Sequence, residues 1–368
     1  MTLIAQAHYL KGAILLSQIN FCLRSRQMKK MAVILSVVVL CAVGGKAQPD
    51  EPLKLVQTIP LSGLQDGDFD HFALDLPGQR LFLCAEENGA VEVIDLHEGK
   101  VVQTLRDTKT PHSMAYDTES KKLFVLDEGP PNRVAIFEGN PLKLSDSIPT
   151  DAHTDASIFD AANHMLYAGN GGRMAHEDFC LLTMVDTKSG KKVGEIKLDS
   201  DHIEAMAIEK SGPRMFVNLT DKSAVAVIDR EKRTVLATWP NGDGGKANGP
   251  MAFDEANHRL FVVSRNPNNV IVLDTDSGKI VAVLPSTGQF ISDDAVYDPG
   301  SKRLYVAGTP FINVFQQRSP NGYQLLGQVP TSYHSNTALL VPQLHRYYVA
   351  VNHHGNVDAK VQVYELVE

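Results

Sequence analysis

Short apolar stretches alternate with polar turns along the chain, and one phrase recurs seven times. In each copy an apolar strand ends on an acidic position, called here the turn slot, and a second strand begins six residues later with a phrase such as Leu-Phe-Val. The slots, spaced by 42, 43, 49, 45, 44 and 43 residues, are Asp75, Asp117, Asp160, Glu209, Asp254, Asp298 and a degenerate Val341. A period near 44 with short strands predicts the blades of a β-propeller.

Two further strands complete each repeat. A third strand is expected at 90–95, 224–229 and 270–274, and a fourth at 100–105. The chain ends after a third strand, at 360–366, while a solitary strand at 53–58 opens the repeat region. We therefore predict an all-β, seven-bladed β-propeller over 48–368, a single domain whose N-terminal strand closes the last blade and leaves no unpaired terminal edge.

The repeat resembles that of the YVTN-repeat propellers, also called YncE-like or surface-layer-type propellers. The resemblance is clearest in the sequence from 81 to 105, and it extends over essentially all of 48–368. The resemblance implies a secreted or periplasmic protein of a family mostly without assigned activity. It says little about function, because one fold hosts many functions.

The first 47 residues have a different character. They contain six basic residues and no acidic one, and from Met28 they read as a basic start, an apolar run over 31–45, and small residues at Gly45 and Ala47. This pattern is typical of a secretory signal at 28–47, with 1–27 as an upstream extension. The run is short for a membrane span of about 20 residues, although an uncleaved anchor is the alternative. We expect a periplasmic or secreted bacterial protein with no membrane span after cleavage.

Charge and cysteine content narrow the partners. The net charge is −8, and without 1–47 the chain keeps all 43 acidic residues but only 29 of its 35 basic ones, a net charge of −14. Such a surface repels a phosphate backbone, so a nucleic-acid partner is not expected. Cys84 and Cys180 fall in strands of different repeats and are expected to be free buried thiols. The chain is expected to be a monomer.

The candidate functional residues, mainly histidines and acidic residues, lie where the first strand of each repeat begins. These strands should line the central channel, and the loops leading into them define what we call the top face; the turn slots face the bottom. The position five residues before each slot reads Asp70, His112, Asp155, Glu204, Gly249, Asp293 and Asn336. Three blades carry His-x-acid or His-x-amide pairs, begun by His153, His202 and His334, and alternation in an extended strand would place both members on one face. Gly249 leaves the fifth blade without a functional group.

Imidazoles and carboxylates on facing strands are what a borderline divalent metal ion needs. The candidate metal ligands are His112, His153, Asp155, His202, Glu204 and His334. The wider candidate pocket is formed by Asp70, His71, His112, Asp155, Glu204, Asp293, Asp294, His334 and Asn336. The same groups could instead act as general acid and base, recognise a polar ligand without a metal, or only line a wet channel.

The leading hypothesis is a binding or scaffold protein that takes a small molecule or a protein at its top face, with a divalent metal ion as the one cofactor considered. The alternative is a metal-dependent, lactonase-like hydrolase of small extracytoplasmic substrates. A third hypothesis is a redox protein with copper at the channel mouth. The insertion at 169–179 could be a lid, a contact loop or only tolerated variation in loop length. No residue is identified as catalytic.

Overall fold

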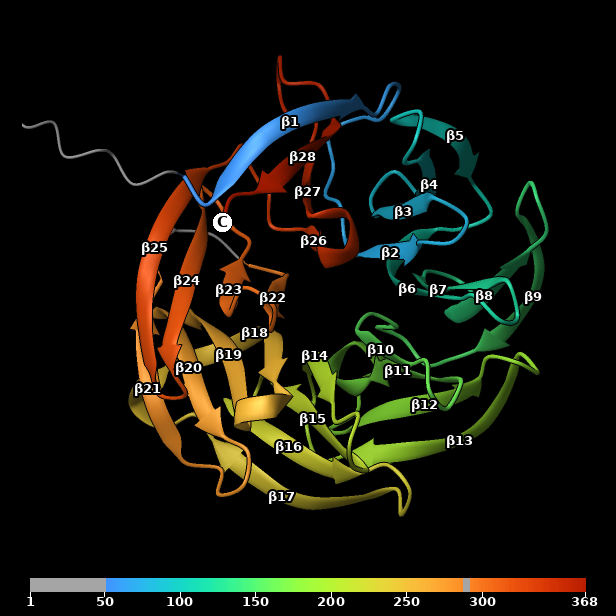
Figure 1. Ribbon diagram of the computed structural model, residues 1–368. Coiled ribbons are helices and arrows are strands. Elements are labelled where there is room, and N and C mark those ends of the chain that lie inside the picture. Colours follow the sequence, from blue (N-terminus) through green and yellow to red (C-terminus); the bar gives the residue numbers. More distant parts are fainter. Residues whose placement is uncertain (1–50, 287–291) are drawn as a thin grey trace, which may run out of the picture. The chain divides into compact units, whose positions relative to one another are not determined.

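In the computed structural model, the described residues, 51–286 and 292–368, form seven four-stranded antiparallel sheets around a central channel (Figure 1). This confirms the predicted seven-bladed propeller. The expected signal segment lies outside the described residues. Among the helices of the described part, none is long and apolar enough to span a bilayer.

The strands follow the predicted order. Blade 1 has β2 (Phe72–Asp75), β3 (Arg80–Ala85), β4 (Ala90–Asp95) and β5 (Lys100–Leu105); blade 2 has β6 (Thr110–Asp117), β7 (Lys122–Glu128), β8 (Arg133–Glu138) and β9 (Lys143–Pro149). Blade 3 has β10 (Ser157–Asp160), β11 (Met165–Gly171), β12 (Cys180–Asp186) and β13 (Lys191–Leu198), with the 3₁₀ turn η1 (Gly172–Ala175) after β11. Blade 4 has β14 (Ile203–Ile208), β15 (Arg214–Leu219), β16 (Ala224–Asp229) and β17 (Thr234–Pro240).

The remaining blades repeat the arrangement. Blade 5 has β18 (Lys246–Asp254), β19 (Arg259–Asn266), β20 (Asn268–Asp274) and β21 (Ile280–Pro285), with η2 (Gly242–Gly244) before β18 and η3 (Glu255–Asn257) after it. Blade 6 has β22 (Ala295–Asp298), β23 (Arg303–Val306), β24 (Phe311–Ser319) and β25 (Gly322–Pro330). Blade 7 has β26 (Ala338–Val341), η4 (Pro342–Leu344), β27 (Arg346–Val351) and β28 (Lys360–Leu366), and β1 (Leu53–Pro60) is its outer strand.

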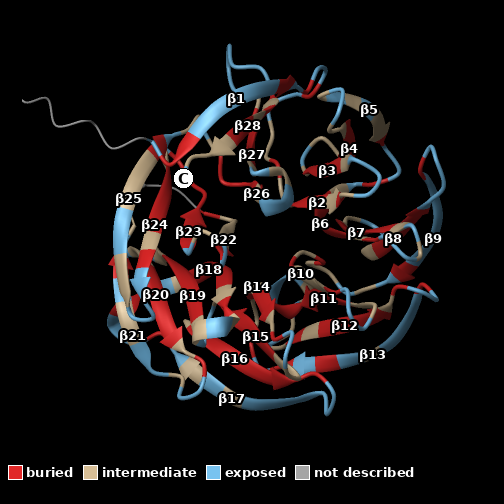
Figure 2. Ribbon diagram, viewed as in Figure 1, coloured by how far each residue is buried: buried red, intermediate tan, exposed pale blue. Residues whose placement is uncertain are grey.

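Burial follows the position of a strand within its blade. Strands such as β3 and β4 are buried at nearly every residue, whereas outer strands such as β9 and β17 are largely exposed (Figure 2). The middle strands are covered on both faces by neighbouring blades, which explains their continuous apolar text. Cys84 and Cys180 lie in this core as free buried thiols, as predicted.

The ring is closed by hydrogen bonds between the two ends of the repeat region. β1 pairs antiparallel with β28, from Leu53 opposite Leu366 to Pro60 opposite Lys360, with a bulge between Leu55 and Gln57. Blade 7 thus takes strands from both ends of the chain, and Figure 1 shows β1 lying outside β28.

The turn slots hold adjacent blades together at the bottom face. Asp75 and Asp160 accept N–H groups of their own turns, as expected. In addition, a residue near the end of a third strand bonds to the slot of the preceding blade: Thr187, just after β12, donates from Oγ1 to Asp117 at 2.7 Å, and Gln317, within β24, donates from Nε2 to Asp254 at 2.8 Å.

The same contact recurs in two other forms. Arg230 donates to Asp160, so a charged pair replaces the neutral donor there. At the closing junction the degenerate slot Val341 is buried in the same apolar cluster as Leu96, so an apolar pair takes the place of the polar one.

These bottom contacts are expected to contribute measurably to stability. Gln317 also accepts a hydrogen bond from the buried Tyr297 hydroxyl at 2.7 Å. Replacing Gln317 by Leu should lower the free energy of unfolding by about 2–4 kcal/mol, because two buried polar partners lose a bond. Chemical denaturation would measure this. The exposed Gln324→Leu, on β25, is the control, and an equal loss in both variants would contradict the assignment.

Candidate functional site

A cavity of about 250 Å³ lies at the top of the channel, where the residues leading into the first strands meet. Its polar lining consists of six carboxylates, one guanidinium, three imidazoles and one amide: Asp68, Asp70, Glu86, Asp155, Glu204, Asp293, Arg265, His71, His112, His334 and Asn336. Eight of the nine residues expected in the pocket are in this lining. The ninth, Asp294, contacts it through His71, whose Nδ1 lies 3.1 Å from Asp294 Oδ1.

The segments before the first strands differ from the expected extended form. β10 begins only at Ser157 and β26 at Ala338, and His153 and His334 have left-handed φ angles of 57° and 49°. The predicted strand alternation is therefore wrong for these two pairs, because the chain turns before it reaches the channel. His202 does contact its paired acid, with Nε2 3.1 Å from Glu204 Oε1.

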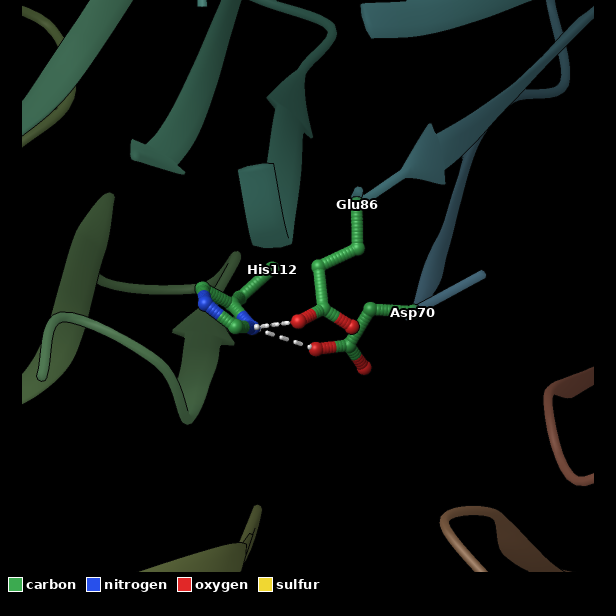
Figure 3. Close-up of side chains that lie close together, drawn as sticks. All are labelled: Asp70, Glu86 and His112. Atoms are coloured by element: carbon green, nitrogen blue, oxygen red, sulfur yellow. Dashed lines mark hydrogen bonds and ion pairs between the residues drawn. The ribbon is translucent and has the colours of Figure 1, made fainter. Parts of the chain in front are cut away.

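Three groups converge on one wall of the cavity (Figure 3). His112 projects from β6, Asp70 precedes β2, and Glu86 follows β3. His112 Nδ1 lies 2.8 Å from Asp70 Oδ2 and 3.9 Å from Glu86 Oε1, and one ligand atom from each residue lies within 4.8 Å of the others. All three side chains are largely covered, with exposed fractions of 14%, 25% and 11% for Asp70, Glu86 and His112.

The charges of this cluster are strongly coupled. Burial lowers the pKa of His112, but Asp70, Glu128 and Asp155 more than offset this and raise it to about 11, so the imidazole is cationic at neutral pH. Burial raises the pKa of Glu86 to about 7, against the opposing charge of His112. The cluster therefore holds protons that a metal ion could displace.

Next to this cluster, Glu128 connects two of the expected ligands. Its Oε2 lies 3.4 Å from His112 Nε2 and 3.7 Å from His153 Nδ1, and these imidazoles hold the pKa of Glu128 well below its usual range. His153 is in turn 3.8 Å from Asp155 Oδ2. His153 thus lies behind the cavity wall, in contact with carboxylates.

His202 is held on both ring nitrogens. Arg173, in η1 of the blade-3 insertion, contacts Nδ1, and a guanidinium can only donate. With Nδ1 engaged by Arg173, the Nε2 position of His202 is left to donate to Glu204. Its ring lies next to that of His153, with centroids 5.0 Å apart and the two planes tilted by 47°. Neither nitrogen of His202 faces the cavity cluster as a free ligand.

Blade 5 contributes Arg265 where the sequence indicated no functional group. Arg265 Nη1 donates to Glu204 at 2.9 Å and Nη2 to Asp293 at 3.0 Å. Gly249 makes this possible, because a Cβ there would lie 2.8 Å from Arg265 Nε. His202 and Arg265 outweigh burial and lower the pKa of Glu204 to about 2, whereas burial raises that of Asp293 to about 6 despite Arg265.

Three of the residues that sequence reasoning missed share one position in the repeat, whereas Asp68, seven residues before its turn slot, was missed as well and does not. Glu86, Glu128 and Arg265 each stand eleven residues after their turn slots, at 75, 117 and 254. This position is at the top end of a second strand, beside the residues that lead into a first strand. The repeat alignment therefore contains the signal, if it is extended to the second strand.

Comparisons with known proteins agree on the fold. No protein-family model matches the chain, and no curated protein matches it. A chain in the crystal structure of the mitotic checkpoint complex is similar, with a TM-score of 0.70 and 14% identity over 96% of this chain and 99% of that one. A chain of Kuenenia stuttgartiensis hydrazine synthase has a TM-score of 0.59 and 18% identity over 67% of this chain and 83% of that one. These likenesses show the fold alone, a β-propeller.

The buried carboxyl of Glu86 should make stability depend on pH. Its pKa of about 7 in the folded protein exceeds the ordinary value of 4.5, so the folded state binds the proton more tightly and stability falls as pH rises through this window. Without metal, Glu86→Gln should be more stable than the unmodified protein by about 1–3 kcal/mol at pH 8, and the gain should shrink toward pH 4.

Denaturant titrations at a series of pH values would measure this gain. The matched control is Glu98→Gln, at an exposed carboxylate paired with Lys100 outside the cavity. A pH-independent effect of Glu86→Gln, or the same gain in the control, would contradict the electrostatic interpretation.

Proposed function

We propose that this propeller is an extracytoplasmic binding protein that holds a divalent metal ion at its channel mouth, with Asp70, Glu86 and His112 as protein ligands. The observation that carries the proposal is the convergence of these three ligand atoms within 4.8 Å at the wall of a cavity. The compartment is supported by the signal-like text at 28–47 and by the resemblance to secreted propellers.

The chemistry of the donors favours a particular class of ion. Two carboxylates with one imidazole suit a borderline ion such as Mn²⁺ or Zn²⁺ better than an all-oxygen ion such as Ca²⁺. Three protein ligands also leave coordination positions toward the cavity for water or a bound molecule. A cation would offset the excess of negative charge in a lining with six carboxylates and one guanidinium.

The other expected ligands support the site rather than form it. Asp155 lies 3.6 Å from His112 Nδ1, where it adds negative charge to the cluster. Glu204 is engaged by His202 and Arg265, and His334 Nδ1 lies 2.9 Å from Asp68. These contacts fix the walls of the pocket around the proposed ion.

Metal analysis of protein secreted by its own host, and never exposed to chelator or nickel resin, tests the proposal. We expect about one equivalent of a divalent metal, and calorimetric titration with Mn²⁺ and Zn²⁺ should give affinities that rise with pH as the His112 proton is lost. Glu86→Gln and His112→Gln should each weaken binding about tenfold or more.

The matched control for both variants is Glu98→Gln, which should bind as the unmodified protein does. Metal-free protein that also takes up no added ion would overturn the proposal. So would uptake that neither cluster variant changes.

Metal-dependent hydrolysis of a small ester or lactone is the second candidate. Asp293 favours it, because this carboxyl lines the same cavity with a pKa of about 6 and can exchange a proton near neutral pH. The ion would polarise a carbonyl or activate water.

Assays with γ-butyrolactone and p-nitrophenyl acetate test this candidate. If it is right, Asp293→Asn should keep the metal and lose about 100-fold or more in kcat. Absence of turnover by the metal-loaded protein, or equal turnover in the variant, would leave a binding protein.

A further inference from the structure

A second cavity, of about 830 Å³, opens at the bottom face between blades 3 and 4. The buried side chains of Tyr167 and Met184 form its floor, and the half-buried Phe159, Met165 and Ile208 form its walls. The turns over 160–163 and 209–213, the basic residues Arg230 and Arg233 and the acidic Glu231 complete the lining. It lies beside the turn slots, at the opposite ends of the first strands from the channel mouth.

The repeat explains why space remains here. The position five residues after the slot is basic in six blades: Arg80, Lys122, Arg214, Arg259, Arg303 and Arg346. In blade 3 it is Met165. The residue before the slot of the following blade is often aromatic, as in Tyr116, Phe159, Phe253 and Tyr297, but in blade 4 it is Ile208.

Where both large side chains are present, they fill the junction. Between blades 1 and 2 the Arg80 guanidinium lies 5.2 Å from the Tyr116 ring centre and donates to its hydroxyl at 2.9 Å. Between blades 4 and 5 Arg214 lies over Phe216, whose ring is 5.4 Å from that of Phe253. Met165 and Ile208 provide neither the guanidinium nor the ring.

The charged groups around the cavity differ in how far they are engaged. Arg230 is buried and fully used, because it contacts Asp160 and donates to the carbonyls of Glu209 and Gly212 at 2.7 Å. The Glu209 carboxylate accepts from Arg214.

Besides Lys210 on the turn over 209–213, the basic side chain of the lining that remains exposed is Arg233. It is exposed at the rim, lies against Gly194, and makes one hydrogen bond of 3.3 Å to the Val193 carbonyl. Its guanidinium has further donors for an anion.

We propose that this cavity binds a small amphiphile with an apolar or aromatic body and one anionic group. The body would contact Tyr167, Met184 and Ile208, and the anionic group would lie at Arg233. A volume of this size, apolar walls and a small number of polar or charged groups that fix orientation are typical of small-molecule sites. The proposal does not depend on the metal site at the channel mouth.

Fluorescence titration with 1-anilinonaphthalene-8-sulfonate, an aromatic anion, tests this site in the presence of EDTA. We expect saturable binding of one equivalent. Met165→Arg and Ile208→Tyr each rebuild one member of the pair found at other junctions, and each should weaken binding about tenfold or more by filling the cavity. Arg233→Gln should weaken it less.

Circular dichroism and thermal melting show whether the variants fold. If one of the two cavity variants, Met165→Arg or Ile208→Tyr, does not fold, the other one decides the test. Lys122→Arg is the matched control, because it changes the same repeat position in blade 2, which is already basic. No saturable binding by the unmodified protein would overturn the proposal. Binding that the folded cavity variants leave unchanged would also overturn it.

Discussion

Closure of the ring is the constraint from which the arrangement of the site follows. A propeller has a channel mouth only if its last blade meets its first, and here the β1–β28 pairing joins the ends of the repeat region. The top face adds side-chain bonds at the same seam, since Asp68 accepts from Asn352 at 2.6 Å and lies 2.9 Å from His334 Nδ1. Once the ring is closed, the residues leading into seven first strands must share one small space, whatever their charges.

That shared space concentrates carboxylates, and much of the chemistry at the mouth is compensation for them. One arc contains Asp70 and Glu128 around the cationic His112, and another has Arg265 between Glu204 and Asp293. Desolvation penalises an ionised carboxylate unless its partners outweigh burial, so the pKa of Glu204 is lowered to about 2 while those of Glu86 and Asp293 are raised to about 7 and about 6. The negative charge of Glu86 is thus the least well compensated, because the cationic His112 does not outweigh the cost of burial. An added cation would stabilise the ionised carboxylate most at this position.

The fold could be predicted from the sequence because the same pattern recurs in seven copies that agree with one another. The period, the turn slots and the single N-terminal strand are all explained by one closed ring. The site was harder to predict, because its contacts depend on how far each side chain extends and on the local backbone conformation. Arg265 occupies the space that Gly249 vacates, which no alignment of first strands alone could indicate. His153 was expected on an extended strand, but its left-handed φ turns it toward Glu128. The position of a residue in the repeat predicts which region of the protein it lies in. The length and conformation of its side chain decide which groups it contacts.

Some residues differ from the repeat pattern, and in most such places a neighbouring side chain fills the space or replaces the bond that is lost. At the closing junction Val341 replaces the slot acid, and Leu96 replaces the polar partner, so the junction stays packed. Gly249 omits a side chain at the mouth, and Arg265 fills the space. Met165 and Ile208 omit two large side chains, yet the buried long side chain of the same cavity, that of Arg230, is directed to Asp160 and to carbonyl groups instead. Close packing is the rule in protein interiors, so a junction where it fails without compensation is a place where a ligand can supply the missing contacts.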